Sequence, residues 1–519
     1  MATLWPRLQQ IFRLRGLFVS IKSNATCTCP NFSTPTQPSA MPADIHDIPP
    51  EILAVAFEIG IHTWGIGFIS PLPRVCQNWR FVVDNTPRLW GIISVAPRSS
   101  PSALEKQIMQ IMKAKASPLS IWISASATRG LRRSGVQEQL FALSDNWVSA
   151  DVETAFLSQS GTRWSNLRYN LQTLTLHRGS LIYDNPGSCF EDSTSNSHFH
   201  RQETLHTFFA DSLANAWTVG FLGPWIKHFH LRHSQKITDT WDFLSRIPRA
   251  ITIELCQVQH VDHPDSVPPL PRLIVLSKLW SLRLKSVKLA PAVLNAIAAP
   301  SLQMLSIHEV PEILHWREVP STRSMSGFFA QWSQPSHTPT HLHTLELIDS
   351  LGSGDTPYFI RWLRRLPNLV RLLITDEEIG KAATSTPTGS NEEANLYNAL
   401  AYPWKEEGGS SSSFAWLCPS LMILYLHTGP ELIDLIHIAR SRGGIAPPTT
   451  DIPPPARLRR LESHLCPVHN QGELDELKSL IDEANCICTQ CGLTIEGDFS
   501  FFFVTCRPIL TMRLLDNSR

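Results

Sequence analysis

The feature that most constrains the fold of this chain is a six-residue apolar pattern that recurs between residues 171 and 426. Its first, fourth and sixth positions are apolar in LQTLTL, LWSLRL, LQMLSI, LHTLEL, LVRLLI and LMILYL, which begin at residues 171, 279, 302, 342, 369 and 421. IKHFHL at 226 and AITIEL at 250 match more loosely. Alternating apolar residues are typical of a strand that buries one face. We therefore expect strands from successive repeats to stack, because one repeat cannot bury its apolar face alone.

The spacing of these hexapeptides resembles the period of leucine-rich repeats. Successive starts are 24, 29, 23 and 27 residues apart in places, and 55, 40 and 52 residues apart elsewhere. PAVLNAIAA and ELIDLIHIARSR are expected to form returning helices, and KQIMQIMKAKASPLSIWIS predicts a helix followed by a strand. The resemblance implies an α/β fold with an irregular leucine-rich repeat solenoid over residues 166–519, interrupted by low-complexity insertions. Residues 96–165 would connect it to the segment before.

A second apolar segment, residues 44–95, precedes the repeats and predicts a small helical module. Pro49 and the proline after it mark the start of a helix that places Leu53 and Phe57 on one face. A second helix would carry Trp79 on its apolar side. A unit of this size buries too little apolar surface to be very stable by itself. Part of its apolar surface is therefore expected to be covered by a partner.

This segment resembles the F-box, a three-helix module that docks on a Skp-type linker protein of cullin-RING ubiquitin ligases. The resemblance rests on PPEIL, VCQNWR and TPRLW, in the form common among fungal F-box proteins. It implies a Skp-type linker protein and a cullin scaffold as partners. The residues expected to contact the linker are Ile48, Pro49, Pro50, Ile52, Leu53, Phe57, Val75, Cys76, Trp79 and Trp90.

The two resemblances together imply a substrate receptor of a ubiquitin ligase, in which the repeats bind a target protein. Such a subunit performs no chemistry and needs no cofactor. Phosphate-binding, dinucleotide-binding, zinc-protease and nucleophile-elbow motifs do not occur in the sequence. Two alternatives stay open: a hydrolase-like enzyme on an irregular α/β fold, and a repeat scaffold unrelated to ubiquitin transfer.

Polar residues between and after the apolar positions of the repeats are candidates for target recognition, because they have no packing role. They include His230, Arg232, Arg283, Lys285, His308 and His427. Only Glu254 and Glu346 oppose them in the matched hexapeptides, so this strip is expected to be positive and to bind an acidic or phosphorylated segment. The alternative is that these are solvated side chains at strand ends.

Two Cys-rich stretches near the C-terminus could supply four zinc ligands, Cys466, His469, Cys488 and Cys491. The apolar face of the helix predicted between them favours a further repeat with buried thiols instead. No metal is therefore expected here.

Composition excludes several classes of partner. Lys and Arg together number 45 and balance 45 Asp and Glu, so the chain lacks the positive field of a nucleic-acid-binding protein. No apolar run is long enough to span a membrane. Eleven dispersed cysteines are typical of a reducing compartment, the cytoplasm or nucleus. Residues 1–43 hold basic residues and no acid, and are expected to be a disordered extension, with a mitochondrial presequence as the alternative.

Overall fold

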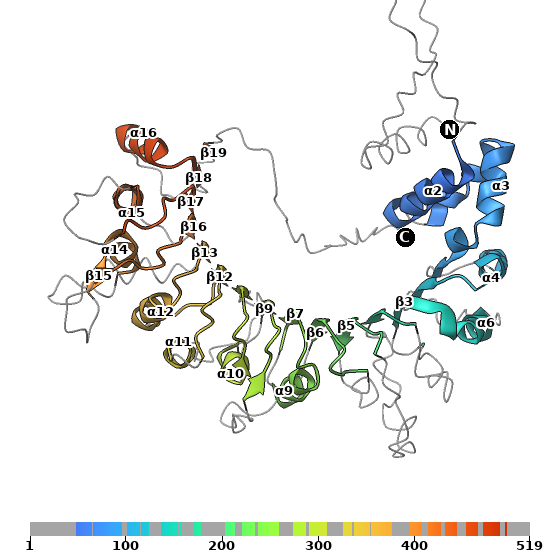
Figure 1. Cartoon of the computed structure of the whole chain (residues 1–519), viewed down its shortest axis with the longest axis horizontal. Coiled ribbons are helices and arrows are strands. Elements are labelled where there is room, and N and C mark those ends of the chain that lie inside the picture. Colours follow the sequence, from blue (N-terminus) through green and yellow to red (C-terminus); the bar gives the residue numbers. More distant parts are fainter. Residues whose placement is uncertain are drawn as a thin grey trace, which may run out of the picture. The chain divides into compact units, whose positions relative to one another are not determined.

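The computed structural model divides the chain into two compact units, residues 1–299 and 300–519 (Figure 1). The residues that it describes are 48–64, 66–95, 101–114, 116–123, 136–153, 156, 170–177, 203–212, 221–233, 237–258, 273–286, 290–308, 325–334, 337–352, 354–375, 395–405, 414–426, 431–443, 453–464, 471–487 and 494–495. In both units, short parallel strands alternate with helices.

The first unit opens with a cluster of short helices, which we call the helical cluster. It consists of α2 (Pro50–Trp64), η2 (Ile66–Ile69), η3 (Leu72–Arg74), α3 (Gln77–Asn85) and η4 (Pro87–Trp90). Leu53, Phe57 and Trp79 lie in its core, where the rings of Phe57 and Trp79 meet edge to face with centroids 4.9 Å apart. The Cys76 sulfur accepts a hydrogen bond from the Trp79 backbone N–H and caps α3.

The strands of the first unit begin directly after this cluster and follow one another in chain order. They are β1 (Ile92–Val95), β2 (Leu119–Ile123), β3 (Trp147–Glu153), β4 (Thr173–His177), β5 (Thr207–Ser212), β6 (His228–His233), β7 (Thr252–Cys256) and β9 (Ser281–Lys285). Each pairs in parallel with the next. A parallel neighbour requires a crossover connection, which explains the helices between the strands.

These connections include α4 (Pro101–Ala114), α6 (Val136–Ala142), η6 (Ser144–Asn146), α9 (Ile237–Arg246) and α10 (Ala290–Asn295), with the short strands β8 (Ile274–Val275) and β10 (Ile297–Ala298) paired to each other. Figure 1 shows α9 and α10 on the same side of strands β6, β7 and β9. The predicted helix and strand of residues 106–124 correspond to α4 and β2.

The second unit repeats this arrangement. Its main sheet contains β11 (Met304–His308), β12 (Thr344–Ile348), β13 (Arg371–Ile374), β16 (Ile423–Leu426), β17 (Arg460–His464) and β18 (Glu483–Ile487), all parallel, and then β19 (Thr494–Ile495), which is antiparallel. The helices are α11 (Ser326–Trp332), α12 (Thr356–Leu363), α14 (Leu396–Ala401), α15 (Leu432–Arg442) and α16 (Gln471–Leu480). A separate hairpin pairs β14 (Trp404–Lys405) with β15 (Phe414–Ala415).

The hexapeptide pattern correctly identifies the core. Every first, fourth and sixth residue of the six closely matching hexapeptides is at most 3 % exposed. Leu305, Leu345, Leu372 and Leu424 lie side by side in register across β11, β12, β13 and β16. Leu282 pairs in the same manner with Ile253 in the first unit. The prediction that the apolar positions of the hexapeptides are buried is confirmed for these five leucines.

The expected α/β class is also confirmed, as a mixed structure with extended parallel sheet. Of the two returning helices expected from sequence, ELIDLIHIARSR forms α15, whereas PAVLNAIAA is helical only within α10 and continues into the strand β10. Among the described residues, no helix combines the length and apolar character needed to cross a membrane.

Candidate functional site

The first candidate site is the surface of the helical cluster, which the sequence analysis expects to bind a partner protein. The structure divides the predicted contact residues into two groups. Leu53, Phe57 and Trp79 are at most 2 % exposed and pack against one another, so a partner cannot reach them while the cluster is folded. Ile48, Val75, Cys76 and Trp90 are partly buried against the same core.

The remaining predicted contacts form the exposed first turn of α2. Pro49, Pro50 and Ile52 face solvent. Ile52 and Val55 are 38 % and 39 % exposed, and their separation by three residues places them on one face of the helix. We call this pair and the two prolines the α2 surface. Phe81 on α3 is 60 % exposed, whereas the next two residues, Val82 and Val83, are in the core. The sequence analysis did not identify Phe81 as a surface residue.

The second candidate site is, in each unit, the sheet face opposite the described helices, which we call the open face of that unit (Figure 1). Alternate strand residues point to it and are half-buried, whereas their neighbours form the core. One registered row crosses the first unit through Asp151, Thr175, Phe209, His230, Glu254 and Arg283. In the second unit a corresponding row contains Glu346, Leu373, Tyr425 and Glu462.

His177 lies between two carboxylates on the open face of the first unit. Its Nε2 is 2.7 Å from Asp151 Oδ1, and its Nδ1 is 3.1 Å from Asp211 Oδ2. Both ring nitrogens donate when the carboxylates are ionised, so the arrangement favours the imidazolium. The hydrogen bonds that His177 donates to Asp151 and Asp211 raise its pKa to about 10, although burial acts in the opposite direction. Asp211 also pairs with Arg232 at 3.8 Å.

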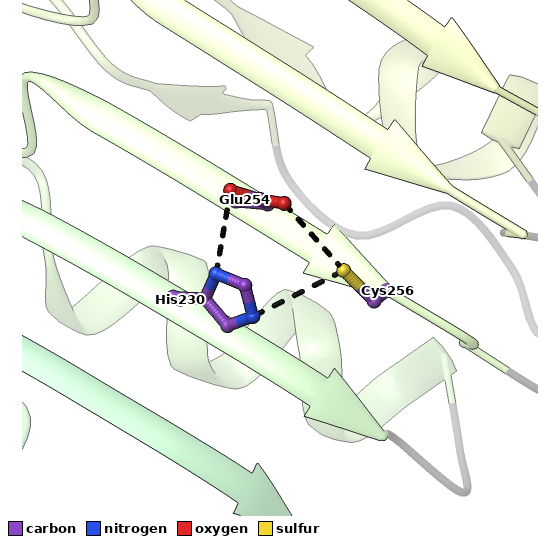
Figure 2. A group of neighbouring side chains, drawn as sticks. All are labelled: His230, Glu254 and Cys256. Carbon is purple, nitrogen blue, oxygen red and sulfur yellow. Dashed lines mark hydrogen bonds and ion pairs between the residues drawn. The ribbon is translucent and has the colours of Figure 1, made fainter. Parts of the chain in front are cut away.

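A second group on this face centres on Glu254 (Figure 2). Its Oε2 is 3.4 Å from His230 Nδ1, and its Oε1 accepts a hydrogen bond of 2.6 Å from Lys285 Nζ. The Cys256 sulfur lies 4.0 Å from His230 Nε2 and 3.8 Å from Glu254 Oε1. The His230 ring stacks on Phe209 with centroids 3.7 Å apart.

Contacts within this group shift two pKa values in opposite directions. The hydrogen bond with His230 and that with Lys285 hold the pKa of Glu254 at about 2, against the effect of burial. Burial and the nearby Glu254 charge raise the pKa of the Cys256 thiol to about 11. The carboxylate is therefore charged at neutral pH, and the thiol keeps its proton.

The open face of the second unit carries a chain of polar contacts. Ser306 Oγ donates to Glu346 Oε2 at 2.9 Å and lies 2.7 Å from His308 Nε2. Because the hydroxyl has one proton, this histidine nitrogen must be the donor in the second contact. Arg371 pairs with Glu346 at 3.3 Å and lies over the Tyr425 ring.

These contacts keep Glu346 ionised. Burial alone would raise its pKa, but the neighbouring His308, the hydrogen bond from Ser306 and the charge of Arg371 lower it below the usual value. Beyond Tyr425, the guanidinium of Arg460 lies 5.5 Å from the same ring and pairs with Glu462 at 3.7 Å.

The structure corrects the expectation of a positive strip. His230 and Lys285 are paired with Glu254, Arg232 with Asp211, and His308 with Glu346. Arg283 is half-buried on β9 in the same row, while His427 lies outside the described residues. The charge expected from sequence included the acids Glu254 and Glu346 but not Asp151, Asp211 and Glu462. The positive charge of this face was therefore overestimated.

The zinc ligands considered near the C-terminus, Cys466, His469, Cys488 and Cys491, lie outside the described residues. The expected extension over residues 1–43 also lies outside them.

Comparison with known proteins adds no family. No family model matches this sequence, and no curated protein matches it significantly.

Proposed function

We propose that this chain is a substrate receptor of a cullin-RING ubiquitin ligase. The helical cluster would act as an F-box-like module that docks on a Skp-type linker protein. The strands of the two units would act as an irregular leucine-rich repeat array that binds a target protein. The chain would bring the target to the transfer machinery by positioning and would perform no chemistry itself.

The observation that carries the proposal is the α2 surface. Ile52 and Val55 are apolar, exposed and on one face of a helix, although the cluster already has a closed core of its own. Adjacent exposed aliphatic side chains mark a surface for association when they are not needed for folding. Ile52 belongs to the PPEIL segment, which carries the F-box resemblance, and Val55 follows one turn later.

The repeat array supports the second half of the proposal. A row of solvent-facing side chains runs over successive strands, and none of these side chains is needed for the leucine core. An acidic target segment would have to compete with Asp211, Glu254 and Glu346 for the cations of this face. Recognition would therefore depend on exchanging ion pairs, which makes it sensitive to salt.

One observation favours the alternative of a hydrolase-like enzyme. The Cys256 thiol contacts one nitrogen of His230, and Glu254 contacts the other, as in a site where a base activates a thiol and an acid orients the base. However, the pKa of the thiol is raised to about 11, whereas a nucleophilic cysteine needs a lowered pKa. The electrostatics of this group therefore favour a role other than nucleophilic catalysis.

Co-expression of the full chain with a Skp-type linker protein tests the proposal. The wild-type chain is expected to co-purify with the linker, and a variant with Ile52→Asp and Val55→Asp is expected to lose it. Loss of one buried apolar anchor costs about 2 kcal/mol or more, so the double change should abolish recovery. Gln77→Asp is the control for added negative charge, since it introduces one aspartate at an exposed site on α3.

Both variants change exposed side chains and should keep the circular dichroism spectrum and melting temperature of the wild type. Full recovery of the linker with the folded double variant would exclude the α2 surface as the docking site. Absence of the linker from the wild-type preparation would contradict the receptor assignment itself.

A further inference from the structure

We propose that His230, Glu254 and Cys256 form a zinc-binding site on the open face of the first unit. This proposal is independent of the receptor assignment. One potential ligand atom from each residue lies within 4.8 Å of the other two, and all three residues are half-buried. Imidazole, carboxylate and thiolate are the three ligand types that zinc takes from proteins.

The backbone places the three side chains together. Glu254 and Cys256 are two residues apart on β7, so both point to the open face. His230 is the registered partner of Glu254 on β6. Ligands supplied by adjacent strands of a packed sheet are held more rigidly than ligands on a loop.

The shortest contacts among the three side chains join different atoms of the His230 ring and of the Glu254 carboxylate. Zinc bonds of about 2.0–2.3 Å separate neighbouring ligand atoms by about 3.3–3.7 Å. His230 Nδ1 and Glu254 Oε2 are 3.4 Å apart, and the Cys256 sulfur is 3.8 Å from Glu254 Oε1 and 4.0 Å from His230 Nε2. Figure 2 shows the three groups converging above the two strands. One ligand atom from each side chain lies within 4.8 Å of the other two, so the side chains must close in by about 1 Å for all three to bond one ion.

Contacts around the group orient its members. Phe209 stacks on the His230 ring and restricts its tilt. Lys285 contacts Glu254 through Oε1, while Oε2 faces His230. Coordination through Oε2 alone would leave the Lys285 contact in place, and metal-bound carboxylates commonly keep such a second hydrogen bond.

Two forces oppose binding, and zinc must overcome both. The Lys285 ammonium repels a cation, and the Cys256 thiol must lose its proton. Zinc deprotonates a coordinating thiol because its double charge outweighs the burial and the neighbouring carboxylate that stabilise the neutral form. Within the described residues no fourth His, Cys, Asp or Glu joins the three, so water or an incoming group would complete the coordination.

Metal titration of the purified full chain tests the site, with Zn²⁺ competed against a chromophoric chelator and Co²⁺ as a spectroscopic probe. The wild type is expected to bind Co²⁺ with a thiolate-to-cobalt charge-transfer band that added Zn²⁺ removes. Cys256→Ser and His230→Asn should each weaken Zn²⁺ binding at this site by about tenfold or more. Lys285→Met should tighten it by about tenfold, because it removes a positive charge beside the ion.

Two controls separate this site from other ligands in the chain. His228→Asn changes an exposed histidine on the same strand and should leave binding unchanged. A variant with Cys466→Ser and Cys491→Ser removes two of the four C-terminal candidates and should keep the Cys256-dependent component. Equal Zn²⁺ stoichiometry and equal cobalt spectra for the wild type and Cys256→Ser would overturn the proposal. If Cys256→Ser misfolds, X-ray absorption of the wild-type zinc complex decides, since a shell without sulfur excludes Cys256.

Discussion

Because His177 contacts Asp151 and Asp211, we expect the free energy of unfolding to depend on the protonation of this histidine and hence on pH. The pKa of His177 rises from 6.5 in the unfolded chain to about 10 in the folded protein. The folded state therefore binds the proton more tightly than the unfolded state does. The resulting stabilisation is fully present below pH 6.5 and is lost as the pH rises through about 10.

The magnitude follows from the shift and the exposure of the pair. At about 1.4 kcal/mol for each pH unit, the rise from 6.5 to about 10 gives an upper bound of about 5 kcal/mol. The side chains of His177 and Asp151 are 41 % and 40 % exposed, so solvent screens much of this. We expect about 1–2 kcal/mol to remain.

The assay compares urea unfolding of the wild type and His177→Gln at pH 6 and above pH 10. Glutamine can hydrogen-bond but carries no charge, so the variant should be less stable by about 1–2 kcal/mol at pH 6 and nearly equal above pH 10. His228→Gln is the control, because that exposed ring contacts the Thr252 hydroxyl rather than a carboxylate. A difference between wild type and His177→Gln that stays constant over this range would refute the reasoning.

Two further predictions concern the core and the backbone. Leu372→Ala is expected to destabilise the second unit by about 2–5 kcal/mol in urea unfolding, because the side chain is fully buried in the leucine ladder; a loss below about 1 kcal/mol would contradict the packing. Gly91→Ala should destabilise by about 1–3 kcal/mol, since its Cβ would lie 2.4 Å from the Pro118 carbonyl oxygen. Gly327→Ala on α11 has open space and should be stabilising by about 0.4–1 kcal/mol, so equal melting temperatures for the two glycine variants would contradict this account.

The leucine pattern predicts the core well but misses several strands. WVSADV at 147, LHTFFA at 205 and LRRLES at 458 have the same positions buried, although Trp, Phe, Val, Ala and Ser replace leucine at some of them. A buried strand position needs a side chain that fits between its neighbours, and leucine is only the commonest solution. A search that accepted small and aromatic residues would have found these strands.

The missed strands explain the error in the predicted charge of the open face. Asp151, Asp211 and Glu462 each occupy such a strand, and each contacts a cation. Sequence shows which residues face solvent on a strand, but pairing of charges depends on which strands are neighbours. The His230, Glu254 and Cys256 group illustrates this limit, because β6 and β7 bring it together across 24 residues of chain.

The helical cluster shows a different limit. Ile52 and Leu53 are adjacent and equally apolar, yet one is exposed and the other is fully buried. Helical periodicity finds the apolar face but cannot tell its core-facing centre from an edge that is available to a partner. The resemblance to an F-box therefore located the segment, and the burial of individual side chains was needed to select the surface to test.

Calorimetric titration of the purified full chain with a Skp-type linker protein, at two temperatures, tests the central claim most directly. The account predicts saturable binding with a negative heat-capacity change, because the exposed Ile52 and Val55 side chains become covered. The Ile52→Asp and Val55→Asp double variant should show no binding heat at either temperature, whereas Gln77→Asp should match the wild type. A folded wild-type chain that gives no binding, or binding unaffected by the double change, would contradict the account.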